Sequence, residues 1–161
     1  MRQRKSSEII LFVIGCVLIN CIGKEIAEQF VLPVWLDSVG TVLMAYVMGP
    51  VCGTMVGVCG NILYFIFFET SMLYGLTSVA IGVTVGVCAK RGMMNHIFGV
   101  LSTAFLVTLF SVFISVPINY VKTDGVVGNV WGSGVSKFLQ ELGGNQVLSN
   151  IIGQFYLDFF G

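Results

Sequence analysis

The chain has 161 residues, of which 56% are hydrophobic and only 10% are charged. Soluble domains carry about 25% charged residues, so this composition excludes a water-soluble enzyme and predicts an all-α integral membrane protein. Eight basic residues balance eight acidic ones, and a chain without net positive charge is not expected to bind nucleic acid. At roughly 20 residues per spanning helix, residues 1–161 allow a single transmembrane domain of about six helices.

Residues that could support catalysis or bind a metal are scattered along the chain. The five cysteines lie in apolar stretches and form no C-x-x-C pair, so we expect buried thiols without a disulfide framework or metal site. His96 has no second histidine or carboxylate at ligand spacing, and we interpret it as an interfacial residue at a helix start. No Ser/His/Asp or Cys/His arrangement can be assembled. We therefore expect no enzymatic activity, no cofactor and no metal.

Apolar stretches bounded by charges, proline and glycine predict six spans. The i,i+4 pair of Lys24 and Glu28 extends the first helix, and Pro33 stops it. Gly49-Pro50 divides the next uncharged stretch into a helical hairpin, and Pro117 breaks the fifth span. The predicted spans cover residues 9–30, 35–48, 51–68, 70–89, 95–116 and 146–161.

The last third of the chain is less uniform. Residues 122–134 are rich in glycine and polar side chains, which predicts a loop, and residues 136–142 predict a short amphipathic helix. The final apolar segment has no polar tail and no basic flank. We therefore expect the sixth span to be truncated here and the natural chain to continue.

The basic residues predict the orientation, because cytoplasmic loops carry an excess of lysine and arginine. With the N-terminus in the cytoplasm, five basic residues lie inside and three lie outside. The inner ones are Arg2, Arg4, Lys5, Lys90 and Arg91, and the outer ones are Lys24, Lys122 and Lys137. We expect a multi-pass protein of the cell membrane, typically the inner membrane of a bacterium.

Two sets of small residues recur at four-residue spacing in the third and fourth spans. Small residues at this spacing share one helix face and allow another backbone to approach closely. They either pack these two spans together or dock another membrane subunit, and the sequence leaves both open. The positions are Gly49, Gly53, Gly57, Ser78, Gly82 and Gly86.

Polar and aromatic residues gather at the predicted outer side, together with Glu69. Gln146, Asn150 and Gln154 share one helix face, and amides facing lipid would be costly, so this face should point inward. Amides, aromatic rings and one carboxylate suit an uncharged, partly aromatic small molecule better than an ion. The alternative is that the rings form an interfacial belt and the amides join helices. The candidate binding residues are Trp35, Asp37, Asn61, Tyr64, Tyr74, Asn119, Asn129, Trp131, Asn145, Gln146, Asn150 and Gln154.

Several of these stretches resemble the substrate-binding S components of energy-coupling factor (ECF) transporters. The resemblance lies in residues 32–41 (LPVWLDSVGT) and 48–57 (MGPVCGTMVG), because a Gly-Pro-x-x-Gly-x-x-x-Gly hairpin behind an acidic residue is common in that family. Residues 81–92 are similar to the family's fourth span. Residues 154–158 are similar to the start of the sequence with which the family's sixth span ends. The resemblance is carried by glycine spacing and span count over most of residues 9–161.

The resemblance implies a six-helix protein that captures a vitamin or similar micronutrient from outside under a cap of outer loops. It further implies association with a transmembrane T subunit and two cytoplasmic ATPases, since this chain has no Walker A pattern. Two departures stand against it. The first span lacks the Ala-x-x-x-Ala face often used for docking, and the LDSVGT stretch assigns no particular vitamin.

Two other functions fit the same sequence. A membrane sensory module that passes a signal to a cytoplasmic domain absent here would explain an unfinished sixth span. A structural or assembly protein without a small ligand would use the polar cluster only to hold helices together. Reading the gene past Gly161 tests the first, and removing the cluster's polarity at constant volume tests the second.

Overall fold

We describe the protein from a computed structural model, in which residues 6–68 and 72–160 can be described. All regular elements in these residues are helical, as the composition predicted. Four helices are long and apolar enough to cross a membrane. The elements are α1 (Ser6–Gln29), α2 (Val39–Met48), α3 (Pro50–Phe68), the 3-10 turn η1 (Met72–Tyr74), α4 (Gly75–Lys90), the 3-10 turn η2 (Met93–Asn95), α5 (Ile97–Thr123), α6 (Val130–Glu141) and α7 (Gln146–Phe160).

In the first half of the chain, the ion pair in α1 and the turn between α2 and α3 agree with the sequence prediction. Lys24 Nζ lies 3.9 Å from Glu28 Oε1 one turn further along α1. Gly49 ends α2 with a φ of 92°, a conformation that favours glycine, and its N–H donates to the carbonyl of Ala45. Pro50 then begins α3, where its missing N–H costs no helical hydrogen bond. The hairpin predicted around Gly49-Pro50 is confirmed.

The six-span bundle is confirmed only in part. The predicted second span, residues 35–48, is helical only from Val39, and its ten residues reach about 15 Å, half of a bilayer core. Residues 30–38 are irregular instead. The fifteen residues of α7 reach roughly 22 Å at 1.5 Å each. Residues 69–71, including Glu69 and the start of the predicted fourth span, lie outside the described residues.

Two predicted boundaries near the end of α5 are wrong. Pro117 lies inside α5 and does not end it, since a proline removes one backbone hydrogen bond and membrane helices tolerate this loss. The predicted loop over residues 122–134 is also too long. Asn129 has extended backbone and its side chain accepts a hydrogen bond from the N–H of Trp131 at 2.9 Å. This N-cap starts α6 at Val130, six residues before the predicted short helix.

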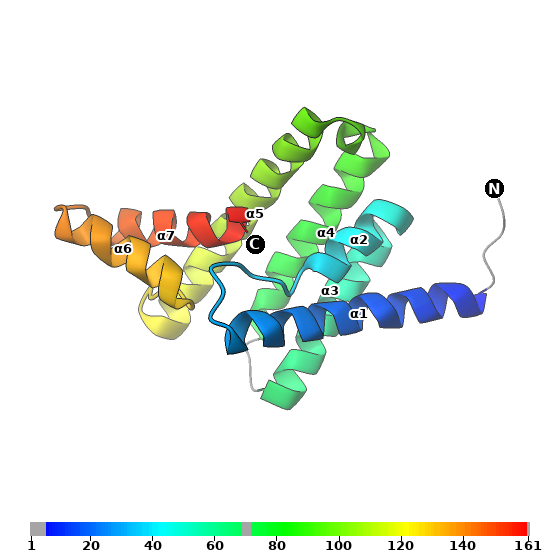
Figure 1. Cartoon of the computed structure of the whole chain (residues 1–161), viewed down its shortest axis with the longest axis horizontal. Helices are drawn as coiled ribbons and strands as arrows, with labels where there is room; N and C mark the ends of the chain where they lie inside the picture. The colour runs from blue at the N-terminus through cyan, green and yellow to red at the C-terminus, as the bar shows by residue number, and fades with distance from the viewer. Residues whose placement is uncertain (1–5, 69–71, 161) are drawn as a thin grey trace.

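The helices form two groups that meet at α5 (Figure 1). In the first group, α2, α3 and α4 pack against one another, and α1 packs against α2 and α3. In the second group, α6 and α7 form a hairpin that packs on α5 through α7. Among the described helices, α5 alone packs against members of both groups, α4 on one side and α7 on the other. The core of the first group contains Cys16, Val17, Met44 and Val56.

The small residues at four-residue spacing are all buried inside this first group. A Cβ on Gly53 would lie 2.4 Å from the Ala45 side chain, and a Cβ on Gly86 would lie 2.4 Å from the Pro50 backbone. The structure thus uses Gly49, Gly53, Gly57, Ser78, Gly82 and Gly86 to pack α2, α3 and α4 together, which is the first of the two roles that the sequence left open. These faces are occupied by the chain itself.

Candidate ligand-binding site

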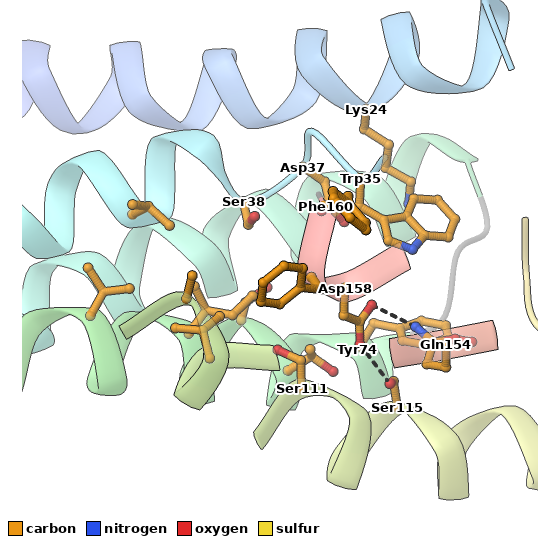
Figure 2. Close-up of a pocket in the computed structure, with 18 of the residues that line it drawn as sticks. Lys24, Trp35, Asp37, Ser38, Tyr74, Ser111, Ser115, Gln154, Asp158 and Phe160 are labelled. Carbon is orange, nitrogen blue, oxygen red and sulfur yellow. Dashed lines mark hydrogen bonds between the residues drawn. The ribbon is translucent and has the colours of Figure 1, made fainter. Parts of the chain in front are cut away.

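A cavity of about 490 Å³ lies where the two helix groups meet, lined by residues of α1, α2, α3, α4, α5 and α7, of both 3-10 turns and of the segment before α2. Its volume falls in the range of about 300–1,000 Å³ typical of small-molecule sites. Val42, Ile81, Val85 and Val107 make one part of the wall apolar. The remaining wall carries the polar side chains shown in Figure 2. A site of this kind can bury an organic molecule and orient it by a few hydrogen bonds.

A directed chain of hydrogen bonds crosses the cavity wall between the two groups. The hydroxyl of Tyr74 donates to Asn119 Oδ1 at 2.6 Å, and Asn119 Nδ2 donates to Gln154 Oε1 at 2.9 Å. Gln154 Nε2 in turn donates to Asp158 Oδ1 at 2.7 Å, and Ser115 Oγ lies 3.4 Å from the other carboxyl oxygen of Asp158 (Figure 2). Each member satisfies the next, so the buried amides remain paired without contacting lipid.

The face of α5 that lines the cavity carries three hydroxyl groups and one amide at regular spacing. Thr103, Ser111, Ser115 and Asn119 recur every four or eight residues, are each at most 5% exposed, and all line the cavity. Thr103 donates to the carbonyl one turn before it. The hydroxyl of Ser111 has no hydrogen-bond partner within the described part of the chain. This face therefore offers one group that a ligand could satisfy.

The carboxyl group of Asp37 lines the cavity from the irregular segment before α2. Desolvation by the surrounding protein raises the pKa of Asp37, and the Lys24 ammonium and the backbone N–H of Asp37 itself partly oppose the shift. Lys24 is also engaged elsewhere: its Nζ lies 3.9 Å from Glu28 and 4.0 Å from the centre of the Tyr64 ring. Lys24 therefore leaves Asp37 only partly compensated.

Aromatic rings surround these carboxyl groups. Trp35 enters from the segment before α2, Tyr74 from η1, and Phe159 and Phe160 from the end of α7. Figure 2 shows the Trp35 and Phe160 rings on the Asp37 side of the cavity, with Tyr74 beside Gln154. Flat rings next to hydrogen-bonding groups are suited to an aromatic or cationic ligand.

Half of the residues predicted from the sequence line this cavity. Asn61 belongs to them through α3, where its amide donates to Ser78 Oγ at 2.7 Å and to the carbonyl of Gly57 at 2.9 Å. The predicted residues that the structure brings together here are Trp35, Asp37, Asn61, Tyr74, Asn119 and Gln154.

The other predicted residues lie outside the cavity wall. The hydroxyl of Tyr64 donates to the Cys21 carbonyl at 2.9 Å, which joins α3 to α1. Asn145 and Gln146 are exposed at the start of α7. Asn150 is buried in a separate cluster, where its carbonyl accepts from Ser136 and its amide lies 3.4 Å from the Tyr120 hydroxyl. Asn150 and Gln154 thus share a helix face but serve different contacts.

Asn129 and Trp131 connect the two helix groups through the segment that follows α1. The indole Nε1 of Trp131 donates to the carbonyl of Val31 at 2.7 Å, and Asn129 Nδ2 donates to the carbonyl of Leu32 at 3.2 Å. We call these two bonds the latch. They hold the start of α6 against the irregular segment that carries Trp35 and Asp37 into the cavity. Neither residue lines the cavity, so their predicted role in binding stays a prediction.

The sequence interpretation missed Asp158, Ser111 and Ser115. A signal existed for Asp158, because it continues the four-residue series of Gln146, Asn150 and Gln154 along α7. The hydroxyl spacing on α5 was a weaker signal, since serine and threonine are common in membrane helices. Among the described residues, no group of three or more histidine, cysteine, aspartate or glutamate side chains could hold a metal ion.

Comparisons with known proteins give no assignment. No protein-family model, no curated protein and no solved structure matches this chain.

Proposed function

We propose that the chain is the membrane substrate-binding subunit of an ECF-type micronutrient transporter, which captures a small molecule from the outer side. The observation that carries this proposal is the 490 Å³ cavity with its directed chain from Tyr74 to Asp158. Such a mixture of apolar wall, aromatic rings and paired amides is typical of sites for organic ligands. The resemblance in residues 32–57 supports the assignment to the transporter class.

In this proposal, the four long helices cross the membrane, and α2 and α7 complete a six-segment bundle. The irregular segment, η1 and the latch then face outside, and Lys90 and Arg91 face the cytoplasm. Gly49 lies against the Lys90 side chain, so the α2–α3 turn is at the same end as these two cations. A membrane-impermeant maleimide should therefore label Lys122→Cys in intact cells, above the level of the unsubstituted chain, and should not label Lys90→Cys. The reverse pattern would contradict the orientation.

The proposal assigns energy coupling to partners, a transmembrane T subunit and cytoplasmic ATPases. The six small residues are buried in packing within the chain, so such a partner would dock on another, lipid-exposed face. Transport would then require the complete complex, whereas ligand capture would require this chain alone.

Capture is tested by mass spectrometry of small molecules released from the full chain purified in detergent. Ser111→Leu fills the cavity from the middle of α5. Ser102→Leu is the matched control, because Ser102 is exposed on the same helix and bonds only to the carbonyl of Phe98. We expect a stoichiometric molecule in the unsubstituted chain and in Ser102→Leu, and its loss in Ser111→Leu.

Two results would contradict the proposal. A molecule retained by Ser111→Leu would lie outside this cavity. A chain that is purified empty, and whose melting temperature no vitamin in a panel raises, would not be a capture subunit. The second result would favour the sensory module or the assembly protein.

A further inference from the structure

The charges that line the cavity are unbalanced. Among the described lining residues, Lys24 is the single cation, and it faces three carboxyl groups, those of Glu28, Asp37 and Asp158. Its ammonium is held between Glu28 and the Tyr64 ring. Asp37 and Asp158 both line the same cavity. Unpaired carboxylates inside a membrane protein are costly and mark functional positions.

The two carboxyl groups differ in how well the protein satisfies them. Asp158 accepts from Gln154 at 2.7 Å and lies 3.4 Å from Ser115 Oγ. For Asp37, the groups that favour its ionised form are the Lys24 ammonium and its own backbone N–H. They come from opposite helix groups, one before α2 and the other near the end of α7, and face the same space (Figure 2). A cation between them would satisfy both, which neither amides nor water can do as well.

An independent observation concerns two buried hydroxyl groups on the cavity wall, which have no hydrogen-bond partner among the described residues. Ser111 is 3% exposed and lines the cavity, yet its hydroxyl has no partner in the part of the chain that the structure describes. The hydroxyl of Thr77, which lines the cavity from α4, also has no partner among the described residues. Buried hydroxyl groups are normally hydrogen-bonded, so a bound molecule with polar atoms would complete them.

We propose that the cavity selects a positively charged organic ligand, a protonated amine or a cationic heteroaromatic ring, held between Asp37 and Asp158. The rings of Trp35, Tyr74 and Phe160 add cation–π attraction around it. This inference rests on the proposed capture function and narrows its substrate class. It also replaces the uncharged ligand expected from the sequence, because that expectation counted one carboxylate and omitted Asp158.

Three probes of the same size test the charge preference: tryptamine, which is cationic at neutral pH, the neutral alcohol tryptophol, and the anion indole-3-acetate. Binding to the full chain in detergent is measured by calorimetry at pH 7. A charge-assisted hydrogen bond is stronger than a neutral one, and we expect tryptamine to bind about ten-fold tighter than tryptophol or more. Indole-3-acetate should bind most weakly.

Variants of the two carboxyl groups test whether they cause the preference for the cationic probe. Asp37→Asn and Asp158→Asn should each reduce the ratio of tryptamine to tryptophol affinity. Asp124→Asn is the control, since Asp124 is exposed in the turn after α5 and its left-handed backbone (φ 52°) also accepts asparagine. If Asp158→Asn does not fold, Asp37→Asn alone carries the test, because Asp37 is outside the directed chain.

Each outcome decides between the two proposals. Probes that bind with equal affinity, and are lost in Ser111→Leu, would overturn the charge preference and leave capture standing. Tighter binding of indole-3-acetate would do the same. Absence of binding by all three probes would overturn the cationic ligand class, whereas capture would then depend on the released molecule.

Discussion

Gln154 lies in the middle of the directed chain of hydrogen bonds and joins Asn119 to Asp158. Its replacement is therefore the most informative perturbation. The variant Gln154→Met keeps the length and volume of the side chain and removes both of its hydrogen bonds. Asn119 Nδ2 then loses an acceptor at 2.9 Å, and Asp158 Oδ1 loses a donor at 2.7 Å. Gln154 is 5% exposed, so packing is retained while two buried polar groups lose a partner.

The magnitude follows from these two losses. A buried polar group that loses its partner costs about 1–3 kcal/mol, and water in the adjacent cavity can partly replace the missing groups. We therefore expect a loss near the lower end, about 2 kcal/mol in total. For a chain of this size this corresponds to a decrease of about 4–8 °C in melting temperature.

The assay is thermal unfolding of the full chain in detergent, followed by tryptophan fluorescence. Gln146→Met is the matched control, because it makes the same change two helical turns earlier on α7 at an exposed position. The control should melt within about 1 °C of the unsubstituted chain, as exposed substitutions usually do. Equal melting temperatures for the two variants would refute the claim that the directed chain holds α7 against α5.

Three further predictions concern packing, the latch and ionisation. Gly86→Ala should lower the free energy of unfolding by about 1–3 kcal/mol, measured by thermal unfolding, since the new Cβ would lie 2.4 Å from backbone atoms of α3. In the control Gly15→Ala, the new Cβ meets nothing within 4 Å, so this variant should be neutral or stabilising. Trp131→Phe removes the indole donor to Val31, and hydrogen exchange should become faster in residues 30–38 but not in α3; unchanged exchange there would refute the latch. Because the protein raises the pKa of Asp37, the ligand-free chain should lose stability as the pH rises above about 4, the ordinary aspartate value. Asp37→Asn should lose less over the same pH range, and parallel melting curves would contradict this.

The sequence was most informative where one residue type has one strong local effect. Gly49 and Pro50 set the α2–α3 turn by their own backbone preferences, and the charge-free stretches gave the long helices. It was least informative where the outcome depends on distant partners. Nothing local distinguishes Gln154, which faces the cavity, from Asn150, which faces α6, because both lie on one face of α7. Ser111 likewise becomes notable only when the helices around it are in place. Pro117 shows the same limit, since its effect on α5 depends on the surroundings.

The position of α5 between the two helix groups has a thermodynamic consequence for binding. Between the described helices the groups make contact through α5, and the latch adds two hydrogen bonds between them. The cavity lies on that boundary and is lined by Asp37 from one group and by Asp158 from the other. A ligand that touches both sides binds the closed arrangement better than an open one, and it shifts the population toward closure by that difference in affinity. By linkage, any contact that favours closure tightens binding by the same factor. If the proposed ligand binds there, we expect substitutions in the latch to change its affinity although the latch residues do not line the cavity.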